Sequence, residues 1–334
     1  MIPAASANAY EAARHGAAIL DRSSRGRIVV SGADRASYLQ GLLTNDIVAL
    51  KAGQGCYAAY LTAQGRMIAD LHVYELGDVI LLMMNGEVKD TLLAKLDQFV
   101  FSEDVQLGDV TASFTQIGVI GPKAATALTA AVPALSLDVL RGLPNDGNVR
   151  AAAGGGALII TKTSDAGEPG YDIYVEPAHA DAVRAALAAA GAVAMDEATS
   201  ESIRIESGVP AFHRDMDEET IPLEAGIESR AICFTKGCYV GQEVIIRVLH
   251  RGHGRVARRL VGLRLDGPRV PLPGAAVMSG DRDVGRITSA AFSPALHGPV
   301  ALAYLHREFV EPGTQVSVDG VGARVSALPF VPLA

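Results

Sequence analysis

The sequence predicts an α+β body followed by a small antiparallel β-barrel. Up to about residue 250, short strands separated by turn residues alternate with single amphipathic helices, and this pattern occurs twice. After about residue 255, strand-like segments recur about every 10 residues between Gly and Pro residues, with no helical pattern among them. We therefore expect two domains: residues 1–250, an α+β body of two interleaved subdomains, and residues 251–334, a small β-barrel.

The first α+β round begins with a strand at residues 27–31 and a helix whose apolar positions lie within residues 38–43. Three apolar segments separated by turns then predict an antiparallel meander, at residues 56–61, 67–75 and 79–84. A helix from Glu87 to about Phe101 is expected to bury Leu92, Leu96, Phe99 and Val100 on one face.

The second round repeats strands and helices. Strands are expected at residues 114–120, 157–163 and 171–176, and helices after Pro122 and at residues 178–190. The barrel strands are expected at residues 260–265, 275–278, 284–290, 300–305, 315–318 and 323–327.

Composition excludes several protein classes. The formal net charge is -8, which argues against a nucleic-acid-binding surface, and no glycine-rich nucleotide loop follows a strand. Three cysteines are too few for a disulfide framework and suit a reducing compartment. No apolar run approaches the roughly 20 residues of a membrane span, and the N-terminus does not resemble a secretory signal. We expect a cytoplasmic monomer without a membrane or direct nucleic-acid partner.

Charge is unevenly distributed along the chain. Residues 196–228 contain ten acidic side chains against two arginines, whereas residues 236–260 are basic and include Arg251 and His253. A basic island on an acidic protein can hold an anionic ligand. An equally weighted alternative is that the acidic and the basic stretch form two solvated faces of opposite charge that attract each other.

The most informative segment is Lys236-Gly237-Cys238-Tyr239-Val240-Gly241-Gln242-Glu243, with Arg247 downstream. Two glycines permit a tight turn with an open backbone, and the two cations would lower the pKa of the Cys238 thiol. A small buried cysteine explains the same residues equally well.

This segment resembles the motif of YgfZ-type proteins, folate-binding relatives of the glycine-cleavage T-protein (GcvT-like proteins) that support iron–sulfur enzymes. The resemblance extends to residues 29–34, 42–46, 201–210, 222–224 and 284–289. It implies a ring of two folate-binding α+β parts closed by the barrel. It also implies a tetrahydrofolate-binding accessory factor for iron–sulfur cluster assembly or repair, with client enzymes as partners and an indirect effect on tRNA modification. The rivals are a tetrahydrofolate-dependent aminomethyltransferase and a folate-binding regulator; the motif favours the first function because T-proteins lack it.

The resemblance also implies folate contacts. Asp70 is expected on the same strand face as Ile68 and His72, and it matches the aspartate that T-proteins place against folate. Asp70 and Cys238 are the two expected catalytic residues. The alternative for Asp70 is an outward-facing Asp. Asn85 matches a folate-contacting asparagine, or else belongs to a plain turn.

Three further cofactor contacts are expected near the second round. Tyr171 and Asp172 occupy the place where relatives carry an acidic residue, a Glu in T-proteins. Arg204 matches a family arginine near folate, but it could instead pair with Glu201 or Glu206. Lys236 and Arg247 are expected to add positive potential for the anionic cofactor.

The remaining cysteines are given no functional role. Cys56 lies in an apolar strand, and Cys233 with Cys238 forms only a weak metal pattern that His250 and His253 do not complete. No metal site is therefore predicted.

Overall fold

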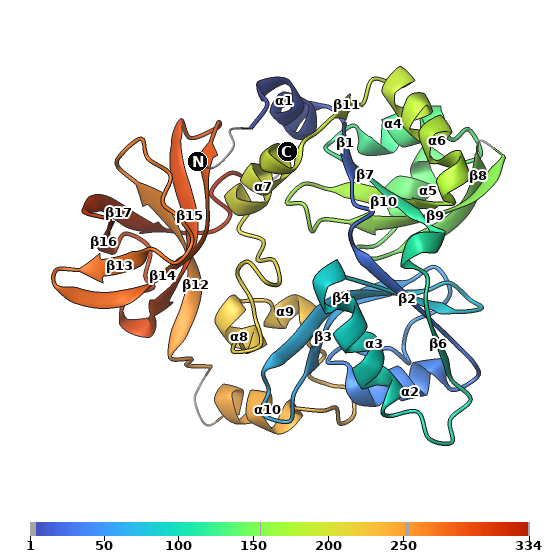
Figure 1. Cartoon of the computed structure of the whole chain (residues 1–334), viewed down its shortest axis with the longest axis horizontal. Helices are drawn as coiled ribbons and strands as arrows, with labels where there is room; N and C mark the ends of the chain where they lie inside the picture. Colours follow the sequence, from blue (N-terminus) through green and yellow to red (C-terminus); the bar gives the residue numbers. More distant parts are fainter. Residues whose placement is uncertain (1–4, 154, 251–253, 333–334) are drawn as a thin grey trace.

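The computed structural model describes residues 5–153, 155–250 and 254–332. Three parts surround a central region, with the helices α7–α9 between them (Figure 1). The predicted α+β body with a C-terminal antiparallel barrel is confirmed. The domain boundary predicted at residue 250 adjoins residues 251–253, which lie outside the described residues, as do Arg251 and His253 of the basic stretch.

The first part is an antiparallel five-stranded sheet in the order β3-β4-β5-β2-β6. Its strands are β2 (Gly26–Ser31), β3 (Gly55–Leu61), β4 (Met67–Glu75), β5 (Ile80–Met84) and β6 (Gln106–Asp109), with helices α2 (Arg35–Leu42), η1 (Gly86–Val88) and α3 (Lys89–Asp97). Strands β4 and β5 are buried along nearly their whole length, which explains the continuous apolar run of β5 and the mainly apolar sequence of β4. The predicted meander is therefore present.

The helix predicted to reach Phe101 ends earlier, at Asp97. The Glu103 carboxylate accepts hydrogen bonds from the backbone N–H groups of Phe101 and Ser102, which turns the chain away from the helix axis. Phe99 is consequently 41% exposed rather than packed on the sheet. The apolar period alone did not reveal this competing turn.

The second part is a six-stranded sheet in the order β11-β1-β7-β10-β9-β8, in which only the short β1–β11 pair is parallel. Its strands are β1 (Ala18–Asp21), β7 (Thr115–Ile120), β8 (Asn148–Ala153), β9 (Gly156–Thr163), β10 (Gly170–Val175) and β11 (Val193–Ala194). Helices α1 (Ala7–His15), α4 (Ala124–Ala131), α5 (Leu137–Gly142) and α6 (Pro177–Ala189) and the η2 turn (Thr111–Ser113) complete it. The sequence did not predict the short strands β1, β6, β8 and β11.

The third part is a closed barrel in the order β12-β15-β14-β13-β16-β17. Its strands are β12 (Arg258–Leu265), β13 (Ala276–Ser279), β14 (Arg282–Ser293), β15 (Gly298–His306), β16 (Gln315–Val318) and β17 (Val321–Ser326), with the η3 turn (Arg307–Phe309). Closure pairs every strand on both sides and so removes the exposed edges of an open sheet.

Four helices connect the body to the barrel: α7 (Glu197–Glu206), α8 (Pro222–Ala225), α9 (Glu228–Ala231) and α10 (Gln242–His250). Asp196 caps the N-terminus of helix α7, and its side chain accepts a hydrogen bond from the Thr199 N–H at 2.7 Å. The helix packs against strand β14 of the barrel. Among the described residues, no helix is long and apolar enough to cross a membrane.

The acidic and basic stretches of the sequence partly neutralise each other. Arg258 Nε lies 3.1 Å from a carboxylate oxygen of Glu224, and Arg259 lies 3.9 Å from Glu228. For these two arginines, the interpretation as mutually attracting faces of opposite sign is correct.

Candidate functional site

A cavity of about 870 Å³ lies between the two α+β parts and helix α7. Its wall combines the turn after β1, the first half of β3, the middle of β4, the end of β5, and the segment that follows α7. Of the eight residues predicted from the sequence, Asp70, Asn85 and Arg204 line it. A second cavity, of about 760 Å³, lies between the barrel and the segment around residues 213–224.

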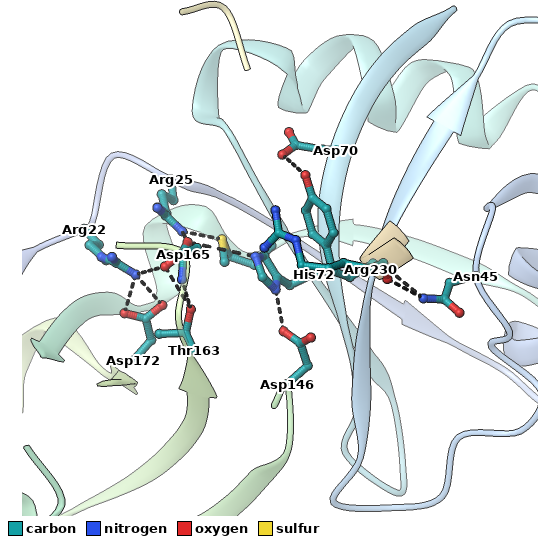
Figure 2. A network of polar contacts seen from close by, with 12 residues as sticks. Arg22, Arg25, Asn45, Asp70, His72, Asp146, Thr163, Asp165, Asp172 and Arg230 are labelled. Atoms are coloured by element: carbon teal, nitrogen blue, oxygen red, sulfur yellow. Dashed lines mark hydrogen bonds and ion pairs between the residues drawn. The ribbon is translucent and has the colours of Figure 1, made fainter. Parts of the chain in front are cut away.

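Asp70 lies on β4 with its carboxylate at the cavity wall. The Tyr57 hydroxyl, from neighbouring strand β3, donates a hydrogen bond of 2.6 Å to Asp70 Oδ2 (Figure 2). Burial raises the pKa of the Asp70 carboxyl, while this hydrogen bond and the nearby His72 oppose the shift. His72 also lines the cavity, as the alternation along β4 predicted. The arrangement suits a carboxylate that accepts a hydrogen bond from a ligand or moves a proton.

His72 connects this carboxylate to the second part. Its Nδ1 lies 2.6 Å from Asp146 Oδ1, and its ring centroid lies 5.1 Å from that of Tyr57. Burial alone would lower the pKa of His72, but the carboxylates of Asp146 and Asp165 raise it above its usual value. The imidazole therefore favours its charged form between these two acids.

Two arginines complete this network (Figure 2). The Arg22 guanidinium lies 2.8 Å from Asp165 and 3.1 Å from Asp172, and Arg25 also binds Asp165. Burial would raise the pKa of Asp165, but Arg22, Arg25 and His72 hold it well below its usual range. Asp172 is fully buried and also accepts a hydrogen bond from the Gln116 side chain at 3.0 Å. Its carboxylate is thus committed to protein partners.

Tyr171 lies on the opposite face of β10 from Asp172. Its hydroxyl donates to the Leu140 carbonyl at 2.9 Å, and its ring packs in the core of the second part. Alternation along the strand separates the two side chains, so Tyr171 does not meet the cavity. The expected cofactor contact by Tyr171 therefore has no support from the geometry.

Arg204 uses all five of its N–H donors within the protein. Its Nε and Nη2 bind the Glu201 carboxylate at 2.8 and 2.6 Å, and Nη2 also donates to Ser289 on the barrel at 2.9 Å. Its Nη1 donates to Asp215 at 2.7 Å and to the carbonyl of Val209. The alternative of an internal pair with Glu201 is therefore present, and Arg204 joins α7, the following segment and the barrel.

Asn85 makes two contacts of its own. Its Oδ1 accepts from the Glu87 N–H at 2.9 Å, and its Nδ2 donates to the Phe212 carbonyl at 3.0 Å. The first contact caps the η1 turn, as the plain-turn alternative proposed. The second ties the first sheet to the segment after α7.

The Lys236–Gly241 turn lies outside the cavity, so Lys236, Cys238 and Arg247 are not among its lining residues. The Lys236 Nζ donates to the carbonyls of Gln40, Leu43 and Asn45 at 2.6, 2.6 and 2.8 Å, at the end of α2. Burial lowers the pKa of Lys236 to about 8, but three acceptors favour the ammonium because a neutral amine has only two N–H groups. Lys236 therefore anchors the turn and is not free to bind a cofactor.

Gly241 anchors the other end of this turn. It adopts φ +85°, and a Cβ there would lie 2.5 Å from the Thr62 carbonyl of the β3–β4 hairpin. Cys238 is exposed between the two anchors, and Arg247 pairs with Glu243 at 2.8 Å on the surface. Cys238, expected from the sequence to act with Asp70, does not line the cavity.

The other cysteines differ from each other. Burial raises the pKa of Cys56 to about 12, which agrees with an inert core thiol. A hydrogen bond with Thr235, at 3.4 Å, lowers the pKa of the Cys233 thiol. Among the described residues, no three His, Cys, Asp or Glu side chains are grouped to hold a metal ion.

Sequence reasoning missed Tyr57, Asp146, Asp165, Arg22 and Arg25. Register could have found Tyr57, since it pairs directly with His72 across the β3–β4 hairpin. Asp146 is 74 residues from His72, and Arg22 is 143 residues from Asp165, so no local pattern links them.

Comparison with known proteins supports both the fold and the family. The GCVT N-terminal domain model matches residues 2–236, and the glycine cleavage T-protein C-terminal barrel domain model matches residues 258–332. The chain is 33% identical to an aminomethyltransferase of Thermus thermophilus, over 96% of this chain and 89% of the relative. It is 31% identical to an aminomethyltransferase of Rubrobacter xylanophilus, over 96% and 85%.

Two further matches extend the comparison. A putative chloroplastic transferase of Arabidopsis thaliana is 30% identical over 97% of this chain and 73% of the relative. The crystal structure of aminomethyltransferase T of the glycine cleavage system from Bartonella henselae superposes with a TM-score of 0.85 at 24% identity, over 97% of this chain and 89% of that chain. Tetrahydrofolate is the cofactor of this family, as the sequence resemblance implied. The chain therefore belongs to the glycine cleavage T-protein family, with both its N-terminal domain and its C-terminal barrel.

Proposed function

We propose that this protein binds tetrahydrofolate in the central cavity and transfers a one-carbon unit from an aminomethyl donor to it. The relatives named aminomethyltransferase cover nearly the whole chain, and they favour this function over the iron–sulfur role inferred first from the sequence. The observation that carries the proposal is the Asp70–Tyr57 pair at the cavity wall.

The cavity fits such a ligand. Its volume, about 870 Å³, lies within the range of pockets that enclose a molecule of this size. Among the described residues, Tyr57 is the one side chain that hydrogen-bonds to the Asp70 carboxylate, and it does so through Oδ2. Oδ1 thus remains to accept a hydrogen bond from an N–H group of a pterin.

The chemistry follows from the environment of Asp70. Tetrahydrofolate would supply the nitrogen nucleophiles for the one-carbon unit. Each new C–N bond replaces a bond from that carbon to its sulfur carrier or to its amino group, so the thiol and ammonia leave and the folate nitrogens lose their protons. A carboxylate whose pKa is raised by burial holds a proton more readily, and the Tyr57 hydroxyl fixes its orientation. Asp70 is accordingly the proposed proton acceptor.

Anaerobic calorimetry with tetrahydrofolate tests the binding site. Wild type should bind and Asp70→Ala should bind more weakly, whereas Asp78→Ala, on an exposed turn outside the cavity, should match wild type. Unchanged binding by Asp70→Ala would remove Asp70 from the site. A reconstituted glycine-cleavage assay with a lipoylated carrier protein then tests transfer, through methylene-tetrahydrofolate production.

A second candidate remains an accessory role in iron–sulfur cluster assembly or repair, as in YgfZ-type proteins, with indirect effects on tRNA modification. The exposed Cys238 favours it, because the thiol lies on the surface of a turn anchored at both ends and can meet a protein partner. Tetrahydrofolate binding without transfer, together with lost iron–sulfur enzyme activity in a deletion strain, would favour this role.

A further inference from the structure

The cations around the central cavity are almost all neutralised by carboxylates. Seven of the eight cationic or titratable basic side chains that line it make an ion pair with a nearby acid: Arg22, Arg25, His72, Lys89, Arg204, His213 and Arg214. Each of these groups is therefore already satisfied by the protein. They can shape the cavity, but binding an anionic ligand would require breaking an existing pair.

Arg230 is the exception. It lies on α9, lines the cavity and is exposed, and in residues 5–153, 155–250 and 254–332 its guanidinium has no carboxylate partner. Its Cζ lies 5.0 Å from the centre of the Tyr57 ring, so the cation lies over the ring of the residue that binds Asp70. The Arg230 carbonyl accepts a hydrogen bond from Asn45 at 3.1 Å, which fixes the backbone at this point. Within the described residues the guanidinium makes no ion pair, so its N–H donors are available to a ligand.

The rest of the exposed rim offers an anion no free cation. The exposed acidic residues of the lining, Asp21, Glu87, Asp90 and Glu197, pair with Arg184, His213, Lys89 and Arg214, and Arg214 is also held by Glu201. An anionic group that enters the cavity is therefore attracted mainly to the charge of Arg230. Among the described residues of the lining, Arg230 is thus the one cationic docking point.

We infer that Arg230 binds a carboxylate of the glutamate tail of the folate and so makes the site selective for ligands that carry an anionic tail. This inference rests on the proposed function. A guanidinium matches a carboxylate with two parallel hydrogen bonds, and the contact with the Tyr57 ring holds it in place before the ligand arrives. The pterin end is left to Asp70, so the two residues recognise opposite ends of one molecule.

The test compares two ligands that differ only in the tail. Tetrahydrofolate and its diamide, in which both glutamate carboxylates are replaced by neutral carboxamides, are titrated anaerobically into the full-length wild type and into Arg230→Gln, Arg230→Lys and Arg247→Gln. Wild type should bind tetrahydrofolate about tenfold more tightly than the diamide, because one partly exposed charge-assisted contact is lost. Arg230→Gln should abolish this ratio while leaving the affinity for the diamide within twofold, and Arg230→Lys should keep part of it.

Arg247→Gln is the matched control, because Arg247 is a surface arginine outside the cavity. It removes the same charge and should preserve the wild-type ratio. Equal affinity of wild type for the two ligands, or an unchanged ratio in Arg230→Gln, would overturn the inference alone. Failure of wild type to bind either ligand would instead overturn the proposed function. Thermal melts of each variant exclude misfolding, which is not expected for an exposed side chain.

Discussion

The wall of the central cavity and the Lys236–Gly241 turn use charge in opposite ways. Around the cavity, acids and bases from distant segments neutralise each other, and Asp70 and Arg230 stand out as the groups with spare bonding capacity. In the turn, the one cation is consumed by three backbone carbonyls, and the thiol of Cys238 stays outside. The comparison teaches that a charged residue's partners, and not its presence in a motif, decide whether it can bind a ligand.

The largest effect is expected for Asp70→Asn. This change keeps the shape and the Tyr57 contact but removes the proton acceptor, so turnover in the glycine-cleavage assay should fall about 100- to 10,000-fold. The melting temperature should not fall, because the change relieves a buried charge. Turnover within threefold of wild type would show that the cavity wall does not supply the base.

Arg204→Met should be the most destabilising substitution at the cavity. It leaves the buried Asp215 without its cation, whereas Glu201 keeps Arg214, at a cost of about 3 kcal/mol in the free energy of unfolding. The control Arg282→Met removes an exposed pair with Glu308 and should cost less than about 1 kcal/mol. Urea denaturation distinguishes them. Equal midpoints would mean that Arg204 is not a structural clamp.

Asp146→Asn should have a pH-dependent effect. The pKa of His72 is higher in the folded protein than its usual value, so the His72–Asp146 pair stabilises fully below about pH 6.5 and loses its contribution as pH rises through the folded pKa. The substitution should therefore cost about 1–3 kcal/mol at pH 6 and less at pH 9. Unfolding curves at both pH values measure this loss of stability. A larger loss at pH 9 than at pH 6 would contradict a raised pKa of His72 in the folded protein.

Cys238→Ala should have the smallest effect on stability, within about 0.5 kcal/mol, since the side chain is exposed. Iodoacetamide should modify Cys238 faster than Cys56, whose pKa burial raises to about 12. Bound tetrahydrofolate should not protect Cys238, because the turn lies outside the cavity. Full restoration of iron–sulfur enzyme activity by Cys238→Ala in a deletion strain would exclude the second candidate function.

Local sequence patterns predicted most of the longer strands and helices. Strand β4 (Met67–Glu75) and strand β16 (Gln315–Val318) have the predicted bounds, because strand length and turn residues are properties of neighbouring positions. The helix predicted to reach Phe101 was too long, because a side-chain contact from Glu103 competes with the apolar period.

In the site, too, some features follow from local sequence and others from tertiary contacts. The sequence by itself determined the α+β class, the barrel and the strand face that Asp70 shares with His72, since alternation along a strand needs no distant partner. Only the tertiary structure decided that Arg204 is saturated, that Lys236 is an anchor and that Arg230 lacks a carboxylate partner in the described residues. The physical reason is that ion pairing depends on distance in space, and Arg22 meets Asp165 across 143 residues of chain.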